Sequence, residues 1–179
     1  MKTSNFSSRR SFLSKSFKGA LFVGAGASFV GSLFKPTNAF AQSSDKALQV
    51  KIAQLGTASL QTSQLALNKA THAEVKLFAK FEAAEQETMG HILKGMGTTV
   101  PAPSAEGTAL LQKLQSLNGA AFDKAFMQGQ VETHRKLHTA VASLMSAAKN
   151  AHVKQVAALA LTTITEHTER GQMLLSKLG

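Results

Sequence analysis

The longest unbroken amphipathic pattern in the chain lies in Gly119–Asn150. This stretch contains no proline, and apolar side chains recur in it at helical spacing: Phe122, Phe126, Leu137, Val141, Leu144 and Ala148. Such spacing predicts one long helix with a single apolar face. A helix of this kind is stable only when that face packs against other elements of the chain.

The same periodicity predicts four more helices, over about residues 44–70, 73–96, 104–117 and 151–178. Short turns are expected at Thr71-His72 and near Asn150, and a longer loop is expected over the proline-containing residues 98–103. Four long helices joined by two tight turns and one longer connection are typical of an all-α antiparallel four-helix bundle. The remaining short helix falls between the second and third long helices.

The first 41 residues have the pattern of a targeting segment. Ser8–Leu13, with Arg9-Arg10 at its centre, closely resembles the twin-arginine export motif, and an uncharged apolar run follows over residues 19–34. This run is shorter than the ~20 residues that a stable transmembrane helix needs. The small-residue pattern Ala39-Phe40-Ala41 then predicts cleavage between Ala41 and Gln42. We therefore expect residues 1–41 to be a signal peptide and residues 42–179 to be a periplasmic domain without a membrane anchor.

The formal charge of +10 is concentrated in this first segment, which holds 6 of the 20 basic residues and no acidic residue. The rest of the chain carries 14 basic and 10 acidic residues without a basic run. A net charge of +4 supports at most weak contact with anionic envelope surfaces, and the chain lacks nucleic-acid-binding motifs. The absence of cysteine excludes disulfides, thiolate metal sites and cysteine nucleophiles.

Polar residues interrupt the apolar helix faces near their middles. Because a helix turns by about 100° per residue, His167 lies on the inward face of the last helix and His134 on the inner flank of the long one. Glu82 and Glu85 lie on the inward face of the second helix. Measured from the turn of each hairpin, the polar residues of that hairpin lie at one depth, about 18 Å in the first hairpin and about 25 Å in the second at ~1.5 Å per residue. A modest stagger between the hairpins would bring both levels together, which predicts a polar cluster in the mid-core.

Two hypotheses account for such a cluster. In the first, it is structural: Glu85 accepts hydrogen bonds from a protonated His134 or His167, and Ser59 or Ser63 completes the network. A buried carboxylate needs partners of this kind, because an unpaired buried charge is costly.

In the second hypothesis, the cluster is a metal site. Glu85, His134 and His167, with Glu82 as an additional candidate, supply enough ligands for one divalent transition metal ion such as Fe, Mn, Zn or Cu. The chain has no Glu-x-x-His, the motif that di-iron bundles carry on two helices. The pattern therefore supports a mononuclear site rather than a di-iron centre.

Several stretches resemble an exported bacterial family of ferritin-like bundles, domain-of-unknown-function family 4142. The resemblance covers about residues 45–178, and its matching stretches are Leu65–Ala70, Val75–Ala79, Asn118–Met127, His134 and Glu166-His167. It implies a ferritin-like four-helix fold and a periplasmic or envelope location. The chain departs from the family pattern at Ser59, where an acidic residue is common, and at Glu85-Gln86, where Asp-His is common.

No catalytic triad, phosphate-binding loop or nucleotide motif is present in the sequence. We therefore expect a non-enzymatic envelope or stress-associated protein without catalytic residues. The alternative is a mononuclear metal-binding ferritin-like protein, for which weak metal-dependent redox activity is conceivable.

Overall fold

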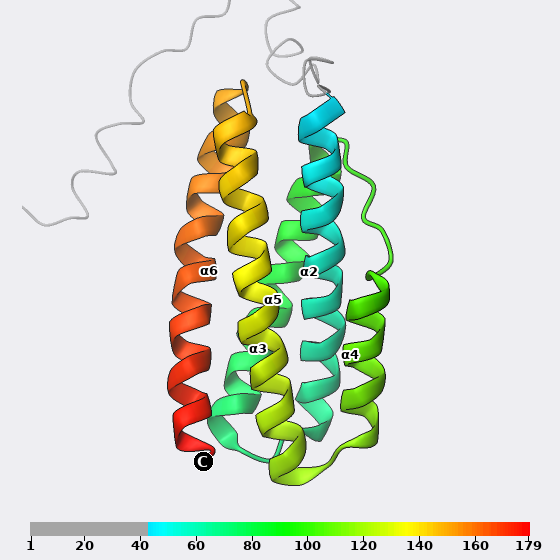
Figure 1. The fold of residues 1–179 in the computed structure, drawn as a ribbon, viewed down its shortest axis with the longest axis vertical. Helices are drawn as coiled ribbons and strands as arrows, with labels where there is room; N and C mark the ends of the chain where they lie inside the picture. The colour runs from blue at the N-terminus through cyan, green and yellow to red at the C-terminus, as the bar shows by residue number, and fades with distance from the viewer. Residues whose placement is uncertain (1–42) are drawn as a thin grey trace, which may run out of the picture. The chain divides into compact units, whose positions relative to one another are not determined.

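The computed structural model describes residues 43–179, with side chains from Asp45 onward, and the expected signal peptide lies outside this range. The described residues form five helices and no strand, which confirms the all-helical prediction (Figure 1). The helices are α2 (Ser43–Lys69), α3 (Ala73–Gly95), α4 (Ala105–Ser116), α5 (Gly119–Ala147) and α6 (Ala151–Lys177). Their bounds lie close to those that periodicity predicts.

The four long helices lie side by side, and consecutive helices run in opposite directions (Figure 1). α2 packs against α3 and α5, and α5 packs against α6. The short α4 runs alongside α2 and also touches α5. In this arrangement α2 and α6 run in one direction, whereas α3 and α5 run in the other.

Local side chains and one glycine set the helix ends. Ser104 Oγ accepts a hydrogen bond from the Gly107 backbone N–H at 3.2 Å and caps α4. Asn150 Oδ1 accepts from the backbone N–H of His152 at 2.8 Å and caps α6. Gly97 adopts a φ of 82° immediately after α3, a conformation that favours glycine and ends the helix as the sequence predicts.

The core consists of two apolar clusters with a polar layer between them. One cluster includes Phe78, Phe122 and Phe126 and lies toward the α2–α3 turn. The other is built from smaller side chains, including Leu137 and Ile164, and lies toward the α5–α6 turn. Each of the four long helices contributes to both clusters, so the polar residues between them are held at one level by packing on either side.

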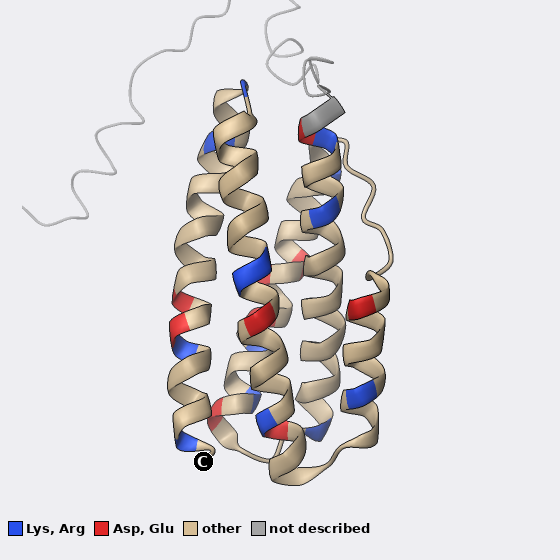
Figure 2. Cartoon of the chain, viewed as in Figure 1, with Lys and Arg blue, Asp and Glu red and all other residues tan. Residues whose placement is uncertain are grey.

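Charged residues are interspersed over the helices in this view, without a stripe of one sign (Figure 2). This distribution agrees with the absence of a basic run in the sequence after residue 41. Within residues 43–179, no helix has the length and apolar character that crossing a membrane requires.

Candidate functional site

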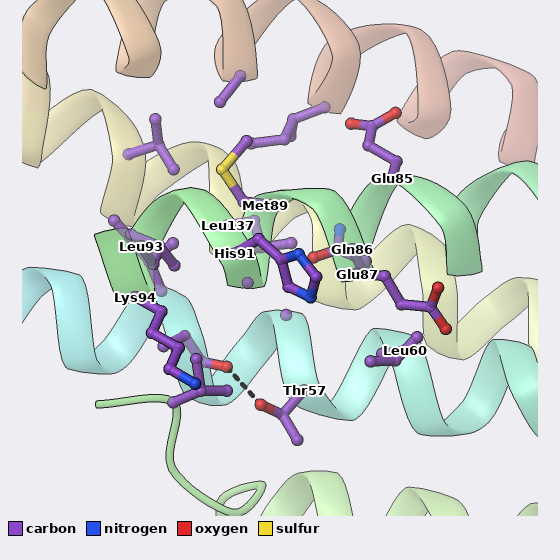
Figure 3. A pocket seen from close by; sticks show the side chains of 18 of the residues that line it. Thr57, Leu60, Glu85, Gln86, Glu87, Met89, His91, Leu93, Lys94 and Leu137 are labelled. Carbon is purple, nitrogen blue, oxygen red and sulfur yellow. Dashed lines mark hydrogen bonds between the residues drawn. The ribbon is translucent and has the colours of Figure 1, made fainter. Parts of the chain in front are cut away.

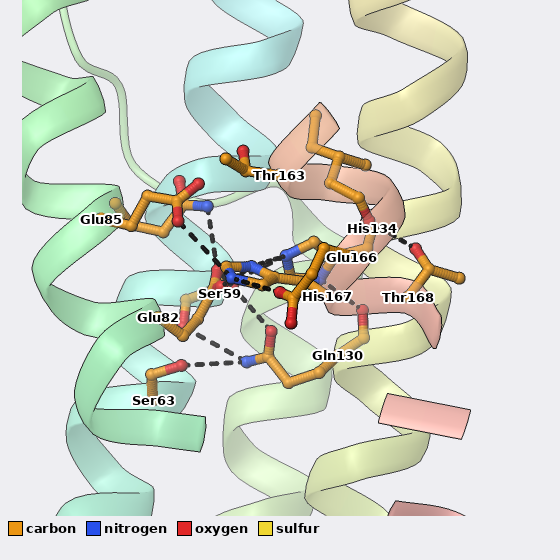
Figure 4. A network of polar contacts seen from close by, with 12 residues as sticks. Ser59, Ser63, Glu82, Glu85, Gln130, His134, Thr163, Glu166, His167 and Thr168 are labelled. Carbon is orange, nitrogen blue, oxygen red and sulfur yellow. Dashed lines mark hydrogen bonds and ion pairs between the residues drawn. The ribbon is translucent and has the colours of Figure 1, made fainter. Parts of the chain in front are cut away.

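The polar layer brings together side chains from all four long helices (Figure 4). Ser59 comes from α2, Glu82 from α3, Gln130 and His134 from α5, and His167 from α6. Glu82 and His134 are completely buried, and His167 is 7% exposed. The cluster therefore lies inside the domain, where unpaired polar atoms are costly.

The two oxygens of Glu82 have different surroundings. Oε1 accepts hydrogen bonds from Ser59 Oγ at 2.6 Å and from Gln86 Nε2 at 2.9 Å. Oε2 lies 2.6 Å from His167 Nδ1 and 3.3 Å from His134 Nε2. Both nitrogens lie within ion-pair distance of Oε2, but no hydrogen bond of standard geometry reaches this oxygen. One oxygen is thus satisfied, and the other faces two imidazole rings.

The outer nitrogen of each ring faces an acceptor. His134 Nδ1 lies 2.8 Å from the backbone carbonyl of Gln130, which favours a hydrogen on Nδ1. His167 Nε2 lies 3.5 Å from Glu85 Oε2 and 3.4 Å from Glu166 Oε2, which favours a hydrogen on this nitrogen. The two inner nitrogens, His167 Nδ1 and His134 Nε2, lie 3.3 Å apart, within hydrogen-bond distance of each other, and both face Glu82 Oε2.

Electrostatics also couples Glu82 to the rings. Burial by itself raises the pKa of Glu82, but the neighbouring His134 and His167 outweigh burial and hold this pKa well below its usual range. Burial lowers the pKa of His167, but its contact with Glu82 and the charges of Glu85 and Glu166 raise it above the ordinary value. An ionised Glu82 therefore lies beside a His167 that binds a proton readily.

Gln130 connects this centre to α2. Its Nε2 donates to Thr62 Oγ1 at 3.0 Å and to Ser63 Oγ at 3.2 Å, and its Oε1 lies 2.7 Å from Ser59 Oγ. These contacts fix the position of Ser59, which in turn donates to Glu82. Gln130 was absent from the sequence hypothesis. Its position four residues after Phe126 and four before His134 is the signal that could have identified it.

Aromatic packing closes the other side of the site. The Phe78 ring makes edge contacts with His134 and His167, with ring centroids 6.4 Å and 5.5 Å apart. Phe78 also contacts Phe126 edge-on. The two imidazoles are thus held by apolar packing on one side and by polar contacts on the other.

The structure rearranges the roles within the predicted set of Glu85, His134, His167 and Glu82. Both histidines lie at the centre, but the central carboxylate is Glu82, the additional candidate. Glu85 lies at the margin, where its side chain is 31% exposed and contacts only the outer nitrogen of His167. Ser59 completes the network as the structural hypothesis expects, although its acceptor is Glu82 rather than Glu85.

The central atoms lie close enough together to share one metal ion after a small adjustment. Glu82 Oε2, His134 Nε2 and His167 Nδ1 are separated by 2.6, 3.3 and 3.3 Å. Two ligands with bonds of about 2.1 Å to one tetrahedral ion lie about 3.4 Å apart. The two separations of 3.3 Å match this spacing, whereas the 2.6 Å between Glu82 Oε2 and His167 Nδ1 is an ion-pair distance that a bound ion would have to widen. The outer ring nitrogens face carboxylates and a backbone carbonyl, which are the usual outer partners of metal-bound histidines.

A second buried carboxylate, Asp123, is fully satisfied and has a structural role. Its oxygens accept from the backbone N–H groups of Thr71 at 3.1 Å and His72 at 2.9 Å, and from Thr71 Oγ1 at 2.6 Å. Asp123 therefore fixes the turn between α2 and α3. The stretch Asn118–Met127, which contains Asp123 and resembles the family, therefore supports the fold and lies outside the Glu82 centre.

The family model described as Domain of unknown function (DUF4142) matches residues 34–174. The chain belongs to this family, as the resemblance in the sequence suggests. No curated protein and no solved structure matches the chain significantly. The family description names no activity, so the function has to be argued from the Glu82 centre itself.

Proposed function

We propose that the domain binds one divalent transition metal ion through Glu82 Oε2, His134 Nε2 and His167 Nδ1. One observation carries this proposal: a buried carboxylate oxygen without a hydrogen-bond partner faces two imidazole nitrogens whose opposite sides are held by acceptors. Three atoms that can each donate an electron pair converge there, and without a metal ion the partner of the carboxylate is a proton on His167. A cation is the chemical species that such a constellation accommodates.

The donor set narrows the choice of ion. Two imidazoles and one carboxylate suit Zn, Fe, Mn and Cu, whereas Mg and Ca favour sites composed of oxygen donors. When bound, an ion with three protein ligands keeps open positions and supplies Lewis acidity or redox chemistry. The residues of the chain hold its ligands in place: Glu85 and Glu166 orient His167, the Gln130 carbonyl orients His134, and Ser59 with Gln86 orients Glu82.

The competing hypothesis is a centre that holds only a proton, as in a purely structural network. In that state the proton resides on His167, close to Glu82 Oε2. The non-enzymatic envelope protein expected from the sequence is consistent with this state. The two hypotheses differ in a measurable property, because a transition metal ion binds stoichiometrically and a proton network does not.

The test is metal analysis of the mature protein as purified, followed by titration with Zn²⁺, Mn²⁺, Fe²⁺ and Cu²⁺. We expect about one equivalent of one of these ions. Glu82→Gln should weaken binding at least about a hundredfold, because outer-shell changes alone cost 10–100-fold. The matched control is Glu87→Gln on the same helix, whose exposed side chain lies outside the centre. Binding below a tenth of an equivalent, before and after titration, would refute the metal proposal.

We also propose that the four long helices form a ferritin-like bundle that is exported to the periplasm by the twin-arginine route. The arginine pair, the apolar run and the Ala39-Phe40-Ala41 pattern support export. Replacing Arg9 and Arg10 together by lysine should leave the protein in the cytoplasm, whereas the control Lys18→Gln should not. Efficient export of the double variant would contradict this route.

A further inference from the structure

A cavity of about 250 Å³ lies among α2, α3, α5 and α6 (Figure 3). Its inner wall is apolar and includes Ile52, Ala53, Leu93, Leu137, Val141 and Ile164. Its exposed lining residues on α3 are Glu87, His91 and Lys94, which face α2 across the mouth. The cavity therefore has a wet rim with charges of both signs and an apolar interior.

The cavity lies one helical turn from the Glu82 centre. Gln86 and Leu137 line it one turn after Glu82 and His134 on two helices that run in the same direction. Gly56 and Ile164 line it one turn before Ser59 and His167 on the two helices that run the opposite way. One turn is about 5.4 Å along the axis, so the cavity is stacked directly on the polar centre, on the side opposite Phe78.

The Gln86 amide separates the cavity from the centre. Its Nε2 donates to Glu82 Oε1 at 2.9 Å, and its Oε1 would lie 2.8 Å from a Cβ atom placed on Gly56. A side chain at residue 56 would therefore displace the end of the Gln86 side chain. Glu85 also lines the cavity and contacts the outer nitrogen of His167. Two side chains therefore touch both the cavity and the centre.

Gly90 leaves part of the cavity unfilled. A Cβ atom at this position would meet no atom within 4 Å, although Gly90 lines the cavity from the interior of α3. Glycine inside a helix costs roughly 0.5–1 kcal/mol relative to alanine. The absence of a side chain here thus carries a cost in helix stability and enlarges the space.

We propose that this cavity binds a small, uncharged, mainly apolar molecule, the size of one aromatic ring or a short alkyl chain. An apolar cavity of about 150 Å³ suffices for benzene, so about 250 Å³ is ample. A charged ligand would lose its hydration inside without finding an opposite charge on the apolar wall. Binding of this molecule does not depend on a metal ion. A role for the cavity in bringing the molecule toward a bound ion would, in contrast, rest on the proposed function.

The experiment measures the affinity of the full domain for toluene by NMR titration or calorimetry. Gly90→Leu, which fills the cavity, should weaken toluene binding at least tenfold. Gly95→Leu is the matched control, because a Cβ there also meets no atom within 4 Å but Gly95 does not line the cavity. The control should bind toluene within about twofold of the parent. If Gly90→Leu fails to fold, Gly90→Ala takes its place, with an expected loss of at least threefold.

Three results would overturn the proposal: no toluene binding up to its aqueous solubility, equal affinity in the parent and Gly90→Leu, or equal loss in Gly95→Leu. If benzylamine or benzoate bound as tightly as toluene, the proposal that the ligand is uncharged would be wrong. The metal proposal is tested separately. Gly90→Leu should keep its Zn²⁺ affinity within about twofold, and Glu82→Gln should lose Zn²⁺ but retain toluene.

Discussion

Two segments of similar sequence, Glu85–Leu93 in α3 and Glu166–Leu174 in α6, occupy corresponding places in the two hairpins. Both contain Glu followed by a polar residue, a glycine four residues later and a buried leucine at the end. In α6 the polar residue is His167, which contacts Glu82 Oε2. In α3 it is Gln86, which donates to Glu82 Oε1. The second residue of each segment thus contacts the same carboxylate, Gln86 at Glu82 Oε1 and His167 at Glu82 Oε2.

The two glycines differ in the same way. A Cβ atom on Gly171 would lie 2.6 Å from Val131 Cγ2, so this glycine lets α6 approach α5 closely. A Cβ atom on Gly90 would meet nothing, because Gly90 faces the cavity. The α6 segment therefore places His167 in a tightly packed region, whereas the α3 segment places the Gln86 amide beside an open cavity. The shared pattern places corresponding residues on the inward faces of α3 and α6. The side chains packed around each residue then determine its role.

The largest expected difference is between substitutions of His167 and Gln86. His167→Ala should destabilise the domain by about 1–3 kcal/mol, because it leaves Glu82 Oε2 without its closest partner and opens a void. It should also weaken metal binding at least about a hundredfold. Gln86→Ala should cost about 1 kcal/mol or less, since Ser59 remains on Glu82 Oε1 and solvent in the cavity can replace the lost N–H. Denaturant unfolding and Zn²⁺ titration of both variants measure these differences. If the two variants changed stability and Zn²⁺ affinity equally, His167 and Gln86 would have equivalent roles.

The glycines provide the second test. Gly171→Ala should destabilise the domain by about 1–3 kcal/mol, because its Cβ overlaps Val131 and forces α5 and α6 apart. Gly90→Ala should stabilise it by up to about 1 kcal/mol, because alanine favours the helix and the space is free. Thermal unfolding should therefore shift in opposite directions for the same substitution. A shift in the same direction for both would contradict the packing difference.

Glu85 and Glu166, the first residues of the two segments, share one contact. Each lies near His167 Nε2, and their side chains are 31% and 45% exposed. Because either carboxylate can accept the ring N–H, Glu85→Gln or Glu166→Gln alone should weaken Zn²⁺ binding by about threefold or less. The double variant should lose about tenfold, within the range for outer-shell partners of metal-bound histidines. If Glu85→Gln alone weakened Zn²⁺ binding by tenfold or more, Glu85 would instead be a direct ligand of the ion.

Much of the fold follows from the sequence because long helices give a strong periodic signal. The turn near Asn150, the loop before Ser104 and the glycine end of α3 are all specified by local side chains. The convergence of His134 and His167 also follows from equal depth within one hairpin. Their meeting with Ser59 and Glu82 depends on the stagger between hairpins, which packing of the two apolar clusters determines.

The choice between Glu82 and Glu85 could not be made from the large apolar residues of α3. Phe78, Ile92 and Met96 suggest an inward direction that favours both acids, yet Ile92 is exposed. The buried alanines Ala79 and Ala83 show that the inward face is rotated toward Glu82. Alanine is only weakly hydrophobic and occurs on both buried and exposed faces. The direction of a buried helix face made of small residues is therefore easily predicted wrongly from the sequence.

The smallest expected effect is a pH dependence that differs between the metal-free and metal-bound domains. The pKa of His167 is raised in the folded state, so its contribution to stability is complete below about pH 6.5 and is lost as pH rises through the raised pKa. The pKa of Glu82 is lowered, so its contribution is present above about pH 4.3 and is lost only as pH falls toward the lowered pKa. The metal-free domain should therefore be most stable between these limits and lose stability above pH 6.5.

Metal binding reverses the upper part of this profile. A ligand histidine must be deprotonated, so the stabilisation that Zn²⁺ adds should grow as pH rises through the pKa of His167. Denaturant unfolding with EDTA and with Zn²⁺, between about pH 5 and pH 8, gives both profiles, and His167→Gln should flatten the loss above pH 6.5 and remove most of the Zn²⁺ gain. His167 would then account for both slopes. If the variant kept the slopes of the parent, the pH response would have to originate outside the Glu82 centre, and the contrast between His167 and Gln86 would lose its electrostatic basis.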